Sequence, residues 1–257
     1  MTKVNQNLKD PFGRIPWKDM FDIAFFLGND LSSKKQSNQL QNNSKPIKTS
    51  AFSKFDENVK TLILSTLANP FQQINELQKN TGISCRQLEI LKDYLITKGY
   101  FIEIAVGKSR FLVGKENIYN LLGLAFPYHK NVPLEHPYLI LLAKNLLEAN
   151  PLIDRIITEV RVKTCPAILD LLTVMKDGQR LGYEVVVKAI DNVCGHAVKI
   201  ESFGLSQLVF LSRDYDIKQT VLAHIKNAGF APNVLSKVHY VLFSQLIRQK
   251  KQLLMRK

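Results

Sequence analysis

The sequence predicts an α/β (α+β) protein with two folded parts behind a flexible N-terminal region. Residues 56–124 show helix-period apolar patterns followed by a short hairpin pattern. Residues 154–188 contain three successive runs of β-branched and apolar residues, which is typical of strands. Residues 32–55 are rich in Ser, Asn, Gln and Lys, so we expect a disordered linker there. We therefore divide the chain at 1–55, 56–124 and 134–257.

The composition is that of a basic protein able to form packed cores. The chain has 257 residues, of which 46% are hydrophobic, and a formal net charge of +13. Such a surplus favours nucleic acid or an anionic membrane surface as partner, although a protein that is merely basic is the simpler alternative. The three cysteines have no metal-ligand spacing and favour a reducing compartment. No apolar run approaches the roughly 20 residues of a membrane span, so we expect a cytoplasmic protein without an integral membrane segment.

The N-terminal region contains one amphipathic pattern. Residues 17–31 predict a short helix that places Trp17, Phe21 and Phe25 on one face. This face either docks onto the protein's own core or anchors a partner protein. A role at a membrane surface is a third alternative, but the helix lacks a strongly basic polar face.

Residues 56–124 predict three helices, a hairpin and a connecting helix. Ser84 with Gln87 three residues later fits a capping box, and Gly99 is suited to end the third helix. The expected helices are Asn58–Ala68, Phe71–Asn80, Cys85–Lys98 and Lys115–Leu124, and the expected strands are Tyr100–Val106 and Ser109–Val113.

This order resembles a winged helix-turn-helix, with apolar and turn residues at matching positions: Ile74, Leu77, Gly82, Ile83, Leu88, Leu91 and Leu95. The resemblance implies that the third helix enters the DNA major groove and that the hairpin, or wing, touches the backbone or minor groove. The candidate DNA-binding residues are Ser84, Arg86, Gln87 and Lys92 on the helix and Lys108 and Arg110 on the wing. Protein docking or homodimerisation is the alternative, since Glu89 and Asp93 are unfavourable neighbours for DNA.

Residues 134–257 predict a mixed sheet with helices on both faces. Asp177-Gly178 marks a hairpin turn between two of the strands. The expected order is a helix over Pro137–Ala149, strands over Ile156–Lys163, Ile168–Lys176 and Arg180–Lys188, a helix over Asp191–Phe203, a strand over Leu208–Ser212, a helix over Ile217–Ala228, and a strand that begins Lys237–Gln252 and leads into a basic helix.

Two carboxylates interrupt these apolar strands. Asp170 and Glu184 stand on the two arms of one predicted hairpin, where a carboxylate is costly to desolvate unless it has a partner. Facing each other, the two would make a site for a cation. Alternatively, they are ordinary partners of nearby arginines, namely Arg155, Arg161 or Arg180.

The position of these acids resembles the restriction-endonuclease-like, PD-(D/E)xK, fold. The resemblance implies that Asp170 and Glu184 hold Mg²⁺ for phosphodiester hydrolysis and that Glu159 completes the set. The sequence departs from the family's pattern in two places. Leu169 stands where the pattern has Pro, and Val186 stands where it has the catalytic Lys. Lys188, the next residue on that strand face, or Lys163 would have to replace it.

We therefore expect a DNA-associated protein without enzyme activity, in which a winged helix is joined to an inactive nuclease-like domain. By analogy, such pairings belong to DNA transfer, plasmid maintenance and mobile elements. The alternatives are a Mg²⁺-dependent nuclease using Asp170, Glu184 and Lys188, and an adaptor subunit of a secretion or DNA-transfer assembly. The five histidines are scattered and predicted to be structural. The basic end, residues 248–257, is either solvated or an arm that touches phosphates.

Overall fold

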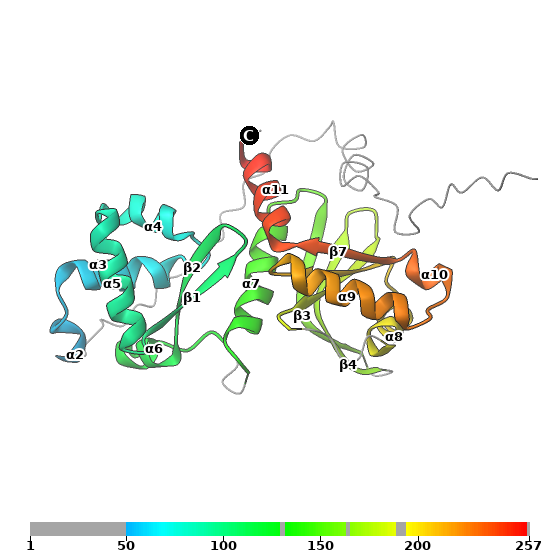
Figure 1. The fold of residues 1–257 in the computed structure, drawn as a ribbon, viewed down its shortest axis with the longest axis horizontal. Coiled ribbons are helices and arrows are strands. Elements are labelled where there is room, and N and C mark those ends of the chain that lie inside the picture. The colour runs from blue at the N-terminus through cyan, green and yellow to red at the C-terminus, as the bar shows by residue number, and fades with distance from the viewer. Residues whose placement is uncertain (1–49, 129–131, 163–164, 189–193, 256–257) are drawn as a thin grey trace, which may run out of the picture. The chain divides into compact units, whose positions relative to one another are not determined.

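The computed structural model describes residues 50–128, 132–162, 165–188 and 194–255 (Figure 1). It contains a two-stranded antiparallel sheet and, further along the chain, a mixed five-stranded sheet, with helices before, between and after them. The predicted mixture of helices and a mixed sheet is confirmed. Among the described residues, no helix combines the length and the apolar character that crossing a membrane requires.

The last residues of the predicted linker, 32–55, contain a helical turn. Helix α2 (Ser50–Ser53) is a single turn, and Phe52 and Phe55 pack against the first hydrophobic core. The ring of Phe55 meets that of Tyr100 edge to face, with centroids 5.9 Å apart. The prediction failed here because two aromatic side chains in a polar stretch have apolar surface to cover. The predicted helix carrying Trp17, Phe21 and Phe25 lies outside the described residues.

Three helices follow, each starting at a recognisable cap: α3 (Glu57–Ala68), α4 (Ile74–Thr81) and α5 (Cys85–Thr97). The hydroxyl of Ser84 accepts a hydrogen bond from the backbone N–H of Gln87 at 3.3 Å, so α5 begins where the sequence predicts. Helix α4 begins three residues later than its predicted start at Phe71. Gln73 and Glu76 form a capping box that fixes the first turn there.

A hairpin and a short helix complete this region: β1 (Phe101–Val106), β2 (Ser109–Gly114) and α6 (Glu116–Leu122). Gly99, at φ 73°, ends α5 in the left-handed conformation that glycine adopts without strain. The first core gathers residues of the helices and of the hairpin, including Leu62, Ile63, Leu77, Leu88, Leu95, Phe101 and Ile118.

The five-stranded sheet has the order β3-β4-β5-β6-β7, and its strands are β3 (Ile153–Val162), β4 (Cys165–Met175), β5 (Arg180–Val186), β6 (Gln207–Ser212) and β7 (Val238–Leu242). Strands β3, β4 and β5 pair antiparallel, whereas β5, β6 and β7 pair parallel. The β4–β5 turn is the predicted one: Gly178 has φ 86°, and the N–H of Gln179 donates to Oδ1 of Asp177 at 3.0 Å.

Helices cover both faces of this sheet: α7 (Glu135–Leu147), α8 (Cys194–Ser202), α9 (Tyr215–Asn227), α10 (Pro232–Leu235) and α11 (Phe243–Met255). Helix α7 packs on β3, β4 and β5, while α8 and α9 pack on β4, β6 and β7 from the other side (Figure 1). The parallel strands end beside the first turn of α7. Ligand sites of open α/β sheets lie outside such carboxyl ends.

Strand β3 forms one edge of the sheet and is irregular. Its pairing with β4 shifts register at two places, and Glu159 is the single described non-glycine residue with positive φ, at 52°. A non-glycine residue in this conformation costs of order 1 kcal/mol. These irregularities all lie within an edge strand of ten residues.

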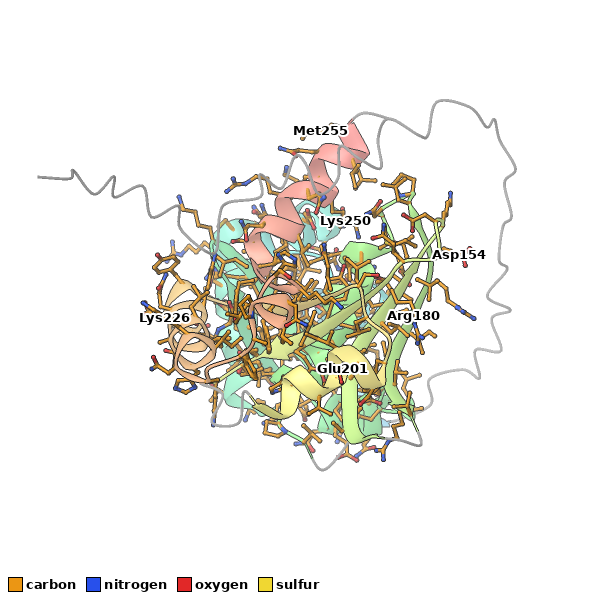
Figure 2. All side chains as sticks on the ribbon, turned by 90° about the vertical axis from the view of Figure 1, so that its right-hand side faces the viewer. Asp154, Arg180, Glu201, Lys226, Lys250 and Met255 are labelled. Carbon is orange, nitrogen blue, oxygen red and sulfur yellow. The ribbon has the colours of Figure 1, made fainter. Side chains whose placement is uncertain are left out.

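The predicted basic arm is in part a packing element. Leu246 and Ile247 are buried side chains of α11, and the ammonium of Lys250 donates to the backbone oxygen and to Oδ1 of Asn145, at 3.2 and 2.7 Å. Burial lowers the pKa of Lys250. Figure 2 shows Lys250 partway along α11 and Met255 at its end. Lys250 therefore fastens α11 to α7.

Candidate nucleic-acid interface and carboxylate cleft

The outer side of α5 starts with an exposed polar turn. Ser84 uses its hydroxyl to cap the helix, and Cys85, Arg86 and Gln87 are exposed in this turn. Arg86 forms no salt bridge with any other residue of the described ranges. A cation and an amide are thus presented at the start of the helix, where a groove-reading helix makes its base contacts.

Lys92, further along α5, lies inside rather than outside. It is 5% exposed, and its ammonium is held by Glu103 of β1 at 2.7 Å and by Glu89 one turn earlier on α5. Arg110 of β2 reaches the same two carboxylates, at 3.0 Å from Glu89 and 3.5 Å from Glu103. The expected outward position of Lys92 is therefore not what the structure has, because its buried ammonium pairs with Glu89 and Glu103, which Arg110 also contacts from the surface.

The contacts of this Lys92 network favour the charged forms of Lys92, Glu89 and Arg110, as the directions of their pKa shifts indicate. Burial disfavours the charged form of Lys92, but hydrogen bonds with Glu103 and Glu89 outweigh it and raise the pKa of the ammonium. The hydrogen bond from Lys92 in turn lowers the pKa of Glu89. The negative charge of Glu89, an unfavourable neighbour for DNA, is thereby balanced within the fold.

The tip of the hairpin carries a second exposed cation that forms no salt bridge with a described residue. Lys108 is exposed in the turn between β1 and β2, beside Gly107. A Cβ atom at Gly107 would lie 3.2 Å from Cβ of Ser244, so the turn passes close to the start of α11. Ser109 donates to Oε1 of Gln73 at 3.0 Å. The hairpin is thus held by α4 and α11, with Lys108 at its surface.

Two apolar side chains also lie on the outer side of α5. Ile90 is 60% exposed and Tyr94, one turn later, is 41% exposed. The sequence interpretation assigned neither a role. Their spacing of four was the available signal, because it puts them on the face of Arg86 and opposite Leu88 and Leu95.

The second site is a cleft at the end of β4 and β5. Oδ2 of Asp170 accepts a hydrogen bond at 2.8 Å from the backbone N–H of Val185 and lies 3.4 Å from Nε2 of His136, which belongs to the first turn of α7. The hydrogen bond with Asp170 raises the pKa of His136, although burial opposes the shift. Asp170 therefore joins β4, β5 and α7.

Glu184 has a partner of another kind. It is 5% exposed, and its Oε1 lies 2.6 Å from the ammonium of Lys199, a buried residue of α8. The same ammonium donates to the backbone oxygen of Ile168 at 2.8 Å. Nδ1 of His196, also on α8, lies 3.4 Å from the other oxygen of Glu184. The expectation that a carboxylate in this strand needs a partner is thus met by α8.

The cleft has a volume of about 410 Å³ and is lined by Pro133, Glu135, His136, Asp170, Glu184, Val185, Val186, Val187, Lys188 and His196. Lys188 lines it from the exposed end of the strand region but forms no salt bridge with a described residue. Glu159, the predicted third acid, is exposed on the edge strand β3 and does not line the cleft. The lysine that meets Glu184 is therefore Lys199, not Lys188.

In their observed positions, the side chains of the cleft do not form a site for the predicted Mg²⁺ ion. Mg²⁺ requires near-octahedral oxygen coordination at about 2.0–2.1 Å. Across the described ranges, no three His, Cys, Asp or Glu side chains are grouped so that they could hold one ion. Here Glu184 is engaged by an ammonium, and Asp170 by a backbone N–H and a histidine.

Comparisons of the chain with protein-family models, curated proteins and solved structures found no match. The two sites are thus defined by their own geometry.

Lys199, His136 and His196 were missed by the sequence interpretation, which treated the histidines as scattered. Lys199 stands four residues before the buried Phe203 within a predicted helix, and a lysine on the buried side of a helix is a signal for a carboxylate partner. For His136 and His196 no such signal exists, because only the folded chain brings α7 and α8 to the same end of the sheet.

Proposed function

We propose that the protein binds double-stranded DNA through the first turn of α5 and the β1–β2 turn, and that it does so without cleaving the DNA. The element order α3-α4-α5-β1-β2 supports a winged helix-turn-helix as the binding module. In that module, the third helix enters the major groove and the hairpin contacts the backbone.

The observation that carries the proposal is the division of charge on this surface. Arg86 and Lys108 are exposed cations without an acidic partner among the described residues, whereas the acids Glu89 and Glu103 are balanced by Lys92 and Arg110. The surface therefore offers net positive charge to a polyanion. The net charge of +13 for the whole chain favours the same partner.

The carboxylate cleft supports the second half of the proposal. The resemblance to the PD-(D/E)xK fold assigns catalysis to Asp170 and Glu184, but the lysine on β5 is replaced by Val186 and both carboxylates are engaged within the protein. A domain of this kind would hold or orient DNA, or support the winged helix, rather than hydrolyse a phosphodiester.

The test is fluorescence anisotropy with duplex DNA over a series of salt concentrations. Replacing Arg86 and Lys108 together by Ala should weaken binding roughly 10-fold or more. The slope of log affinity against log salt concentration should fall by the amount that corresponds to about one phosphate contact. Replacing Lys176 and Lys226, two exposed lysines of the five-stranded region, gives a matched control with the same change in net charge. Equal losses of DNA affinity in both double variants would contradict the proposal, because they would show that the protein attracts DNA only through its overall charge.

The second candidate function is that of an adaptor that docks a protein on α5. Its supporting observation is the exposure of Ile90 and Tyr94, since exposed aromatic and aliphatic side chains on one helix face suit a protein partner. Absence of DNA binding at low salt by a folded, full-length protein would favour this function over the first.

A further inference from the structure

Lys199 occupies a particular place in the cleft. It projects from α8, and its ammonium lies 2.6 Å from Oε1 of Glu184 on β5 and donates to the backbone oxygen of Ile168 on β4 at 2.8 Å. One positive group thus joins two neighbouring strands through oxygen atoms. By the PD-(D/E)xK resemblance, a metal ion would contact oxygen atoms of both β4 and β5.

Side chains of the protein already occupy the positions beside both carboxylates, and Glu184 has the ammonium of Lys199 as its cation. Lys199 is only 5% exposed, so its charge is enclosed together with that of Glu184. His196 lies against the second oxygen of Glu184, and His136 lies against Asp170. A divalent ion bound to Oε1 of Glu184 would have to displace the ammonium of Lys199, which lies 2.6 Å from that oxygen.

We propose that the ammonium of Lys199 is the built-in cation of this cleft, taking the place of Mg²⁺ between β4 and β5. The folded protein then neither binds a divalent ion there nor needs one. Removing the Lys199 side chain frees Glu184 and leaves space beside it, so a divalent ion gains a site that the wild type lacks. This inference goes beyond DNA binding and does not depend on it.

The first experiment is a titration of the full-length wild type with Mn²⁺ in the absence of DNA, followed by electron paramagnetic resonance of free Mn²⁺ and by thermal melting in Mn²⁺ and in EDTA. We expect no bound Mn²⁺ attributable to the cleft and no change in melting temperature. A site filled at a hundredfold excess over its Kd would raise the melting temperature by roughly 5–10 °C, so its absence is measurable.

The second experiment repeats the measurements on Lys199→Ala, with Lys188→Ala as the matched control for a lysine that lines the same cleft. We expect Lys199→Ala to melt well below the wild type in EDTA and to regain part of the loss in Mn²⁺. Lys188→Ala should resemble the wild type in both conditions. The rise in melting temperature that Mn²⁺ causes in Lys199→Ala should vanish when Glu184→Gln is added to that variant.

Three results would overturn the proposal. The first is Mn²⁺ binding by the wild type that Glu184→Gln abolishes. The second is a folded Lys199→Ala that gains no more from Mn²⁺ than the control does. The third is metal-dependent DNA cleavage by the wild type that Lys199→Ala removes, which would make Lys199 part of a nuclease site. Should Lys199→Ala not fold, the wild-type titration decides alone, because binding overturns the proposal and no binding upholds it.

Discussion

Two lysines of this protein are equally buried and serve different purposes. Lys92 and Lys199 are each 5% exposed and each ion-paired. Lys92 shares two carboxylates with Arg110 near the surface of α5, where Glu89 and Glu103 are still 37% and 24% exposed. Lys199 has one carboxylate, which is itself buried, and a backbone oxygen. Burial of a lysine alone therefore does not define its role; the exposure of its partners does.

The largest expected effect is a difference in the free energy of unfolding that is lost when each of the two lysines is replaced. Lys199→Met leaves the carboxylate of Glu184 buried without its cation, and the free energy of unfolding should fall by about 3–5 kcal/mol. Lys92→Met leaves two carboxylates that water and Arg110 still reach, so the loss should be about 1–3 kcal/mol. Urea unfolding measures both. Equal losses would mean that partner exposure does not set the difference.

A smaller effect is expected on DNA affinity, when Glu89 and Glu184 are each replaced by Gln. Glu89→Gln removes one negative charge beside Arg86 while Glu103 still holds Lys92, so duplex affinity should rise roughly two- to tenfold at low salt. Glu184→Gln, in the cleft, should leave the affinity of folded protein unchanged. Anisotropy titrations of both variants test this, after melting curves have shown that each is folded. A fall in affinity for Glu89→Gln would argue against α5 as the DNA-facing helix.

The smallest effect concerns pH and the His136–Asp170 contact. The hydrogen bond with Asp170 raises the pKa of His136 in the folded state above its ordinary value of 6.5. The stability that this contact contributes is fully present below the unfolded pKa and is lost as pH rises through the folded pKa. His136→Gln should remove this dependence, measured by urea unfolding between about pH 5 and pH 8.

His239 has the opposite behaviour and must be separated from His136. Burial lowers the pKa of His239, so its contribution to stability increases as pH rises toward its unfolded pKa. Because His239 is present in both proteins, its contribution cancels in the difference between the wild type and His136→Gln. A difference that does not vary with pH would show that His136 does not titrate with folding.

The sequence predicts the elements well wherever the signal is local. The Ser84 cap, the Gly99 end of α5 and the Asp177-Gly178 turn are each decided by neighbours in the chain, and each lies where expected. The late start of α4 depended on a second capping box, Gln73 with Glu76, in a segment that also fits a longer helix. Local chemistry allows both starts, and only packing selects one.

The candidate sites could be predicted only in part, because their partners are distant in sequence. The need of Asp170 and Glu184 for partners follows from their place in apolar strands, but Lys199 is fifteen residues from Glu184 and His136 comes before either strand. Likewise, the spacing of Lys92 from Leu88 and Leu95 places it on the inner face of α5, but nothing local shows that Glu103 of β1 is its partner. Charge patterns indicate that a pair is needed; the fold determines which residues supply it.

The irregularity of β3 also affects how copies of this protein can associate in solution. Long, regular edge strands invite pairing between molecules and so promote aggregation. Strand β3 spans Ile153–Val162 at an edge of the sheet, but its two register shifts and the left-handed Glu159 deprive a second copy of a straight template. Self-association by continuation of the sheet is disfavoured at β3, whereas a regular edge strand of the same length would put the protein's colloidal stability at risk.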